Sequence, residues 1–312
     1  MAERLKALPW KGSKGLRSSG VRIPLSPHTM NSDLKQQLDD ICSTQPFHVG
    51  YSYINLQAGD TLERFGAQIV PSASTRKVFI LACVLKDVNE GRLCLEDTFH
   101  LQKKYQSDNS GIFRYFTPDR SVITVHDALV GMIAISDNVC TGGLIELIGF
   151  DRLNAYIQTI GLKNTSVQFG SVSSVASNTP VGLESSNVTT PNDAATMLHL
   201  LFKGTTDEVS AINIGLSLVL CNLALEILFM QQFRSRLPAH LPTEARVAHK
   251  GGTRSNVFND VGIIYREHTP LFILTVFTYE VPLMIGAMPG RYVASELIAD
   301  LSRVCYDHSI KS

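Results

Sequence analysis

Apolar positions recur with a helical period in some segments of this chain and alternate with polar positions in others. Leu34, Leu38 and Ile41 follow one another at helical spacing, which predicts an amphipathic helix with its cap near residues 31–33. Residues 47–56 instead alternate and are rich in residues that favour strands, and a turn at 58–60 follows. We therefore expect a helix, a strand and a turn into a second strand in this first part of the chain.

The middle of the chain has a mainly helical pattern. Residues 77–85 are almost continuously apolar, and residues 124–135 and 191–201 have the spacing of amphipathic helices that start at Thr or at Asn and Asp. Residues 169–187 have no helical period and are rich in Ser, Val, Asn and Gly. They predict a long loop, and long loops inside compact enzymes commonly carry function.

The C-terminal part returns to strands. Residues 245–250, 260–265 and 271–278 predict short strands separated by turn signals, and residues 291–306 predict a last amphipathic helix. Strands at both ends of the chain, with helices between them, indicate an α+β fold. In such a fold the early and late strands pair in one antiparallel sheet, and the inserted helices form a second lobe.

The composition agrees with a compact enzyme. The chain has 312 residues, of which 44% are hydrophobic and 18% are charged, enough for a large core and too little charge for a disordered chain. Lysine plus arginine and aspartate plus glutamate number 28 each, so the formal net charge is zero. This balance gives no electrostatic reason to bind nucleic acid or an anionic membrane. We expect a small-molecule or peptide-like substrate, bound by a monomer or a homodimer.

The cysteines and the N-terminal segment bear on the compartment. The six cysteines are scattered, without a C-x-x-C pair or the Cys/His spacing of a metal site, so we expect buried free thiols and neither metal nor cofactor. Residues 1–30 are basic and polar and lack the apolar run of a secretory signal. No later stretch is apolar for long enough to span a membrane. The sequence therefore predicts a cytoplasmic protein with a flexible arm at 1–30.

The first candidate chemistry is the motif Ser74-Thr75-Arg76-Lys77, which precedes an apolar helix. On a helix, Ser74 and Lys77 share a face, and a partly desolvated lysine can take the proton that makes a serine hydroxyl nucleophilic. The amide of Ser74, near a helix N-terminus, is a candidate oxyanion donor. Alone this spacing is weak evidence, because a capping serine and an exposed lysine would also produce it.

The second motif is Ser136-Asp137-Asn138, directly after a predicted helix. Ser136 is a candidate for passing a proton to the leaving group, and Asn138 offers an amide to the substrate. Asp137 reads as a brace of the loop rather than as an acid catalyst. A polar loop with a helix cap would explain the tripeptide equally well if it stood alone.

The third motif is Lys250-Gly251-Gly252-Thr253, at the end of a predicted strand. A strand edge of small residues lets a substrate lie along the backbone, and the amide of Thr253 is a candidate second oxyanion donor. Lys250 would supply positive charge for a substrate carboxylate. His249 should face the opposite side of the strand, where a structural role is expected.

Together and in this order, the three motifs resemble the S-x-x-K, S-D-N and K-T-G set of class A β-lactamases and penicillin-binding proteins. The resemblance covers about residues 31–310 and implies a three-layer α/β/α fold, an antiparallel sheet flanked by helices, with an all-α lobe beside it. The implied domains are the arm at 1–30 and a catalytic domain at 31–312. Within the latter, the α/β lobe takes about 31–70 and 236–312, and the all-α lobe about 71–235.

The resemblance also implies roles for single residues. Ser74 is the acylated nucleophile, Lys77 its base and Ser136 the proton shuttle. Lys250 is the partner of Ser136 and of the substrate carboxylate, and the amides of Ser74 and Thr253 form the oxyanion hole. The implied substrate contacts are Asn138, Gly252, Thr253 and, in the segment that borders the cleft, Tyr105.

Two departures from the family weaken the expectation of efficient β-lactam hydrolysis. Class A enzymes activate the hydrolytic water with a glutamate in an E-x-x-L-N pattern, but the matching residues 172–177 contain no acid, and only Glu184 lies nearby. Gly251 stands where the family usually has Thr, and Val261 stands where an arginine often assists, with Arg254 as a candidate replacement. Neither departure removes an acylating residue.

We therefore expect a serine hydrolase that forms an acyl-enzyme at Ser74 and cleaves an amide, ester or lactam bond as an esterase or amidase and a weak β-lactamase. The alternatives among enzymes are a penicillin-recognising transpeptidase or carboxypeptidase and a glutaminase-like amidase. The alternatives of another class are a sensor that is trapped as an acyl-enzyme and a catalytically inactive binding protein.

Overall fold

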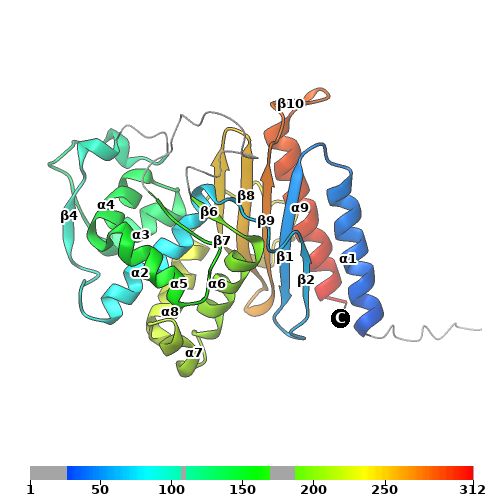
Figure 1. Ribbon diagram of the computed structural model, residues 1–312, viewed down its shortest axis with the longest axis horizontal. Coiled ribbons are helices and arrows are strands. Elements are labelled where there is room, and N and C mark those ends of the chain that lie inside the picture. Colours follow the sequence, from blue (N-terminus) through cyan, green and yellow to red (C-terminus); the bar gives the residue numbers. More distant parts are fainter. Residues whose placement is uncertain (1–26, 107–109, 169–186, 312) are drawn as a thin grey trace, which may run out of the picture.

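The computed structural model describes residues 27–106, 110–168 and 187–311, and of residues 27–31 the backbone alone. Its centre is a five-stranded antiparallel sheet with the order β2-β1-β9-β8-β7 (Figure 1). The early strand β1 pairs with the late strand β9 along its full length, which confirms the predicted pairing. The strands are β1 (His48–Asn55), β2 (Thr61–Arg64), β7 (Ala245–Arg254), β8 (Val257–Arg266) and β9 (Thr269–Tyr279).

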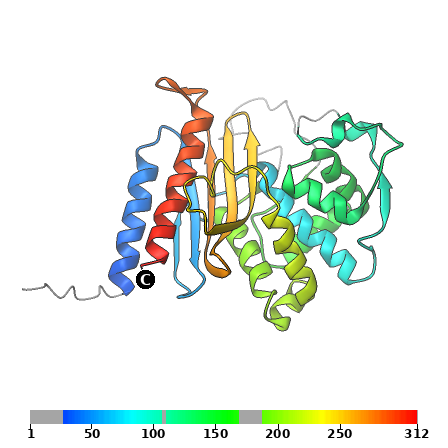
Figure 2. The same cartoon turned by 180° about the vertical axis from the view of Figure 1, so that it is seen from behind.

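Two helices from opposite ends of the chain cover one face of this sheet. Helices α1 (Pro27–Ser43) and α9 (Gly290–Ser309) lie side by side there (Figure 2), and Leu38 packs in one apolar cluster with Leu301. Helix α1 begins at Pro27, earlier than the cap predicted near residue 31. Proline presets the φ angle of a first helical position, so the helix starts there and continues through the polar residues that follow.

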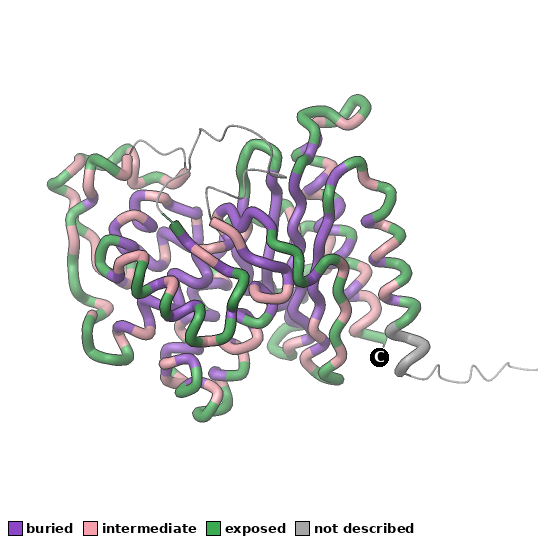
Figure 3. Tube along the Cα trace, viewed as in Figure 1, coloured by how far each residue is buried: buried purple, intermediate pink, exposed green. Residues whose placement is uncertain are grey.

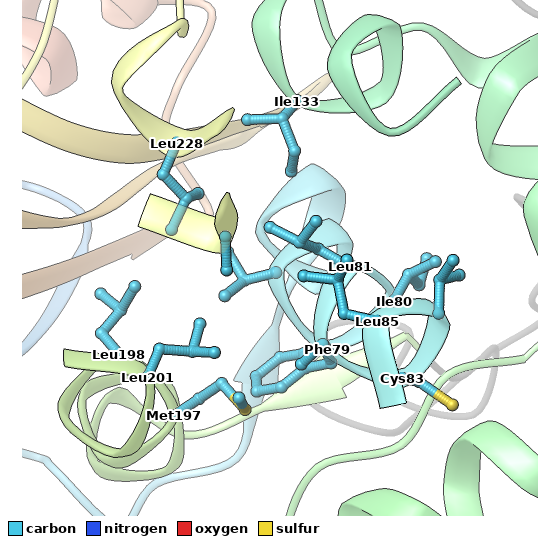
Figure 4. Packing of buried hydrophobic residues seen from close by; sticks show 14 of the residues in the cluster. Phe79, Ile80, Leu81, Cys83, Leu85, Ile133, Met197, Leu198, Leu201 and Leu228 are labelled. Carbon is cyan, nitrogen blue, oxygen red and sulfur yellow. The ribbon is translucent and has the colours of Figure 1, made fainter. Parts of the chain in front are cut away.

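The remaining helices lie on the opposite face and beyond it. They are α2 (Lys77–Asn89), α3 (Val125–Ala134), α4 (Asn138–Ile148), α5 (Phe150–Thr159), α6 (Pro191–Lys203), α7 (Glu208–Asn213) and α8 (Leu218–Phe229). Helix α2 is apolar on all sides because it is surrounded: Phe79 and Leu81 pack against Met197 and Leu228 of neighbouring helices (Figure 4). Buried residues are concentrated in the sheet and in these adjoining helices (Figure 3).

The starts of two predicted helices follow from their caps. The hydroxyl oxygen of Thr124 accepts a hydrogen bond from the amide of Asp127 at 3.0 Å and so caps α3. Thr190 caps α6 in the same way through the amide of Asp193, also at 3.0 Å, and Pro191 occupies the first helical position. The predicted helices at 124–135 and 191–201 are therefore present within two residues of the expected ends.

Short pairings fix the connections between these elements. Strand β3 (Val70–Pro71) pairs with β6 (Val188–Thr189), β4 (Thr98–His100) with β5 (Val122–Thr124), and β10 (Met284–Ile285) with β11 (Met288–Pro289). The predicted loop at 169–187 lies outside the described residues except for its last residue. That residue, Asn187, accepts a hydrogen bond from the amide of Ser72 at 2.9 Å.

Two further features concern the chain as a whole. The six cysteines are free thiols, and all but Cys94 are buried. Among the helices of the described ranges, none has the length and apolar character needed to cross a bilayer.

Candidate active site

Ser74 lies in a single turn of 3-10 helix, η1 (Ala73–Arg76), between β3 and the start of α2. The sequence analysis placed Ser74 and Lys77 on one α-helix, whereas α2 begins only at Lys77. The preceding residue, Ala73, has a φ of 46°, a left-handed conformation that a non-glycine residue adopts at a cost. In a 3-10 turn, side chains three positions apart project to the same side, so the tighter turn preserves the predicted relation.

The segment that carries Ser74 is held from several directions. The side-chain amide of Asn259, on β8, donates to the carbonyl of Pro71 at 2.8 Å. The hydroxyl of Thr75 donates to the carbonyl of Ser72 at 2.6 Å, and the amide of Ser72 is bonded to Asn187. Asn259 also accepts from the amide of Thr278 on β9 and is fully buried. The nucleophile candidate is therefore anchored to the sheet itself.

Lys77 is the centre of the polar group, and its side chain is completely buried. Its Nζ donates to the carbonyl of Ser136 at 2.7 Å, to the hydroxyl of Ser136 at 3.1 Å and to Oδ1 of Asn138 at 2.7 Å. The first residue of α2 is thus joined to the first residue of α4, across a sequence separation of about sixty positions. The structure brings together the first two sequence motifs.

Asp137 holds the second motif in shape. One carboxylate oxygen accepts from the amides of Val139 and Cys140, at 2.8 and 3.1 Å, and caps α4. The other oxygen accepts from the amide of Phe113 at 2.9 Å and so joins the segment after residue 110. Its neighbour Ser136 has a φ of 58°, a second left-handed residue at the site. Asp137 therefore acts as a brace of the second motif, as predicted.

The third motif approaches through Gly252 on β7. A Cβ atom at this position would lie 2.9 Å from the carbonyl oxygen of Ser72 and 3.1 Å from the amide nitrogen of Ser74. Backbone atoms cannot move aside as a flexible side chain can, so only glycine lets β7 approach the turn this closely. The strand residue before Thr253 is thereby packed directly against the amide of Ser74.

We expect Gly252→Ala to slow acylation of the protein about 100-fold, because the methyl group would push β7 away from the turn and separate the two oxyanion donors. The loss of folding stability should be about 1–3 kcal/mol. Gly251→Ala is the matched control, since a Cβ there would be in ordinary van der Waals contact with Arg236 at 3.4 Å, the carbonyl of Asn259 at 3.8 Å and Asp260 at 3.9 Å. The measurement is the rate of adduct formation by mass spectrometry; equal losses in both variants would contradict this account of Gly252.

Arg236 is a residue of this site that the sequence analysis did not identify. One of its amino groups donates to the carbonyls of Gly252 and Asn259, at 2.9 and 2.7 Å, and the other donates to the hydroxyl of Thr253 at 2.6 Å. The amino group that donates to these two carbonyls lies 3.4 Å from the position that a Cβ atom of residue 251 would take. Glycine in place of the family's threonine therefore leaves room for a guanidinium. The glycine at position 251 was the sequence signal that could have indicated such a group. Arg254, the predicted replacement for the assisting arginine, is exposed.

Lys250 is buried on the cleft side of the same strand. Its Nζ donates to the carbonyl of Gly251 at 2.7 Å. Burial lowers the pKa of Lys250 to about 7, the carboxylate of Asp260 acts to raise it, and Arg236 and Arg76 lower it further. The predicted partnership with Ser136 is not seen: within the described residues, the hydroxyl of Ser136 is bonded to Lys77 instead.

Tyr105 lies apart from this polar group. It belongs to a short 3-10 turn, η2 (Lys103–Tyr105), and its hydroxyl donates to Glu146 on the outer side of α4 at 3.2 Å. The ring fills the notch left by Gly142, one turn after Asn138. The contacts of Tyr105 in the described structure are thus with α4, and its role as a substrate contact stays a prediction.

The comparisons with known proteins agree with this geometry. A sequence model described as the beta-lactamase enzyme family matches residues 33–309. Among curated proteins, the chain is 22% identical to beta-lactamase BRO-1 of Moraxella catarrhalis over 291 residues, which cover 91% of this chain and 87% of that protein.

Solved structures with the same fold include PBP-A and a bacterial β-lactamase. PBP-A is 28% identical with a TM-score of 0.75, and the match covers 90% of this chain and 97% of the other; it has also been solved as a glutamate-containing mutant in an acyl-enzyme complex with penicillin G. The β-lactamase of Sphaerobacter thermophilus is 24% identical with a TM-score of 0.75, over 90% and 98% of the two chains.

Proposed function

This chain belongs to the beta-lactamase enzyme family, and we propose that it is a serine hydrolase that forms an acyl-enzyme at Ser74. The observation that carries this proposal is the buried Lys77, whose Nζ is bonded to both Ser136 and Asn138 immediately after the turn that holds Ser74. A serine hydroxyl needs a nearby base, and a lysine removed from water is suited to that role.

The proposed acylation step uses these groups in order. In the reactive form Lys77 is a neutral amine, which donates to the carbonyl of Ser136 and to Asn138 and no longer donates to the hydroxyl of Ser136. The hydroxyl oxygen of Ser74 attacks the carbonyl carbon of the substrate, and its proton passes to this amine. The negative charge that develops on the carbonyl oxygen is stabilised by the amides of Ser74 and Thr253. The proton then moves from Lys77 through the hydroxyl of Ser136 to the leaving nitrogen or oxygen as the scissile bond breaks. The products are the acyl-Ser74 ester and, for an acyclic substrate, a free amine or alcohol.

The substrate class follows from the cations beside β7. Arg236 donates to the hydroxyl of Thr253, and Lys250 donates to the carbonyl of Gly251, two residues earlier on the strand along which we propose that the substrate lies. A planar guanidinium with bonded neighbours is well suited to a carboxylate. We propose an amide, ester or lactam substrate whose acyl or leaving part carries a carboxylate. The acyl-enzyme of PBP-A with penicillin G is a relative's example of such a ligand.

Deacylation is proposed to be slow. The sequence contains no E-x-x-L-N pattern for activation of the hydrolytic water, and residues 172–177 carry no acid. Without that carboxylate, water must attack the ester with weaker assistance. We therefore propose a weak β-lactamase that favours esters or amides. The similarity to PBP-A supports a penicillin-recognising carboxypeptidase as the second candidate.

The test is intact-protein mass spectrometry after mixing with benzylpenicillin and, separately, with an uncharged activated ester. A hydrolase gains the mass of the acyl group and returns to its free mass within minutes to hours. A stable adduct without turnover would favour a penicillin-recognising protein or a sensor. No adduct with either compound would overturn the proposal and direct attention to a glutamine-like substrate or an inactive binding protein.

We expect the two cations to produce a pH-dependent preference for carboxylates. The carboxylate preference is defined as the acylation rate constant for benzylpenicillin divided by that for its methyl ester. Because the pKa of Lys250 is lowered to about 7, Lys250 is protonated below this pH and neutral above it. The carboxylate preference should therefore fall about tenfold between pH 6 and pH 8.5. Lys250→Met should show a low preference at both pH values, and an unchanged preference in the native protein would contradict the assignment.

A further inference from the structure

A buried acid–base pair lies directly behind the strand that carries Lys250. Nδ1 of His249 lies 3.0 and 3.1 Å from the two carboxylate oxygens of Asp260 on the neighbouring strand β8, and both side chains are almost fully inaccessible. Strand pairing places Asp260 opposite Gly251 and His249 opposite Gly262, so the pair shares the sheet face that Lys250 does not occupy. No step of the proposed reaction uses either residue.

Asp260 also holds the backbone next to Arg236. One of its oxygens accepts from the amide of Leu237 at 3.2 Å, directly after Arg236 in the chain, and the other accepts from its neighbour Val261 at 3.1 Å. The guanidinium of Arg236 is then fixed by the carbonyl of Asn259, the residue before Asp260. Asp260 thus joins β7, β8 and the segment that delivers Arg236 to the cleft.

The carboxylate of Asp260 also affects the pKa of Lys250. Arg236, from the segment after α8, and Arg76, from η1, both act against a positive charge on Lys250, whereas Asp260, from β8, favours it. Asp260 acts on the charge of Arg236 in the same direction. Asp260 is therefore the buried anion that opposes the effect of these two arginines on Lys250.

His249 fixes the direction of that carboxylate. Its Nδ1 faces two carboxylate oxygens and therefore donates to them. Nε2 is buried and has no hydrogen-bond partner among the described residues. A buried nitrogen without a partner is unfavourable, and a smaller apolar residue would avoid it. The polar contact that explains a histidine at this position is therefore its bond to Asp260.

We propose that His249 and Asp260 are positioning residues for carboxylate recognition: the pair holds the backbone beside Arg236, so that its guanidinium is aligned with Thr253, and places a buried negative charge behind Lys250. This role rests on the proposed function, because it assigns the substrate's charged end to these cations. It differs from a structural role in one respect. Loss of the pair should lower the acylation rate of substrates that carry a carboxylate. It should leave the rate unchanged for otherwise identical substrates without one.

The test compares the carboxylate preference of Asp260→Asn, His249→Gln and the native protein. Asparagine has one side-chain oxygen, so it can accept from the amide of Leu237 or of Val261 but not from both, and it lacks the charge. We therefore expect the preference at pH 7 to fall at least tenfold. His249→Gln retains Asp260 and should lower it about threefold. Added to Arg236→Gln, Asp260→Asn should lower the preference less than it does alone, because both act on one site. Equal losses for benzylpenicillin and its methyl ester would overturn the proposal.

The matched control is Asp87→Asn. Asp87 is also fully buried and is paired with Arg92 and Arg152, but it lies near the far end of α2, ten residues from Lys77. This variant removes a buried carboxylate and stability without approaching the cleft, and its carboxylate preference should equal that of the native protein. A change as large as that of Asp260→Asn would show that the preference reports only on general loosening of the fold.

A second measurement does not require catalysis. The titration midpoint of Lys250, followed by NMR of isotope-labelled lysine side chains and assigned with Lys250→Arg, should move to lower pH by at least about one pH unit in Asp260→Asn. An unchanged midpoint would overturn the counter-charge role. Absence of any acylation in the native protein would instead be a failure of the proposed function, which this titration separates from a failure of the pair.

Discussion

Replacement of Ser74 by alanine is expected to abolish the adduct with benzylpenicillin and with the activated ester, a loss of at least about 10⁴-fold in acylation rate. The reason is chemical: in the proposed reaction the acyl group is bonded to the hydroxyl oxygen of Ser74, and Lys77 and Ser136 only move protons to and from it. Ser74 is partly buried and lies between backbone anchors at Ser72 and Gly252. Removal of one oxygen there should change stability by less than about 1 kcal/mol.

Ser72→Ala is the control for this experiment. Ser72 is two residues away in the same segment, and its buried hydroxyl has no hydrogen-bond partner among the described residues. Its removal should leave acylation within about threefold of the native rate and stability unchanged or slightly higher. Peptide mapping of the adduct identifies the modified residue. An adduct that survives in Ser74→Ala, for example on Ser136, would show that the nucleophile was assigned to the wrong serine.

The parts of the fold that could be predicted from sequence are those that local signals encode. Helices α3 and α6 have such local signals at their starts: the hydroxyl oxygens of Thr124 and Thr190 each accept from an amide three residues later. The strands β7, β8 and β9 were recognisable by composition and turns, although each is longer than predicted. The start of α1 at Pro27 was missed, because the polar residues that follow resemble a cap and lie inside the helix instead.

The residues of the site likewise fall into those that local sequence patterns predict and those that they do not. Lys77, Ser136 and Asn138 could be named beforehand because their motifs lie at the starts of helices, and the fold then brings those starts together. Gly251 indicates room for another group, but it does not identify Arg236, because its partners Gly252 and Asn259 come from two strands whose register no local pattern gives. Tyr105 was placed by its segment alone, whereas the notch at Gly142 decides where its ring packs.

Two left-handed residues flank this arrangement, and neither is a glycine. Ala73 has a φ of 46° and precedes the nucleophile candidate, and Ser136 has a φ of 58° and belongs to the proton path. Such conformations persist only where the surroundings impose them. Around Ala73 the imposing contacts come from Asn259, and around Ser136 they come from Asp137 and Lys77. The strain therefore lies where the reaction is proposed, and the anchors that maintain it are buried.

Lys77→Met is expected to lower the acylation rate by about 10³-fold, while the protein still folds. Methionine has a similar length but cannot accept the proton of Ser74, and general-base assistance typically contributes 10²–10⁴-fold. The carbonyl of Ser136 and the side chain of Asn138 would each lose a donor, at a cost of about 1–3 kcal/mol per group. This cost is partly offset because a buried lysine side chain no longer has to be desolvated. Rates with benzylpenicillin and its methyl ester should fall equally, since this residue acts on the nucleophile and not on the carboxylate.

Lys86→Met separates the loss of a base from the loss of a lysine on α2. Lys86 lies on the same helix and is paired with Glu90 at 2.7 Å at the surface, so its replacement should leave the acylation rate within twofold. Rates from intact-protein mass spectrometry, with thermal unfolding of each variant, complete the comparison. An acylation rate for Lys77→Met within tenfold of the native rate would place the base elsewhere, with Lys250 as the next residue to replace, because its lowered pKa leaves it largely unprotonated above neutral pH.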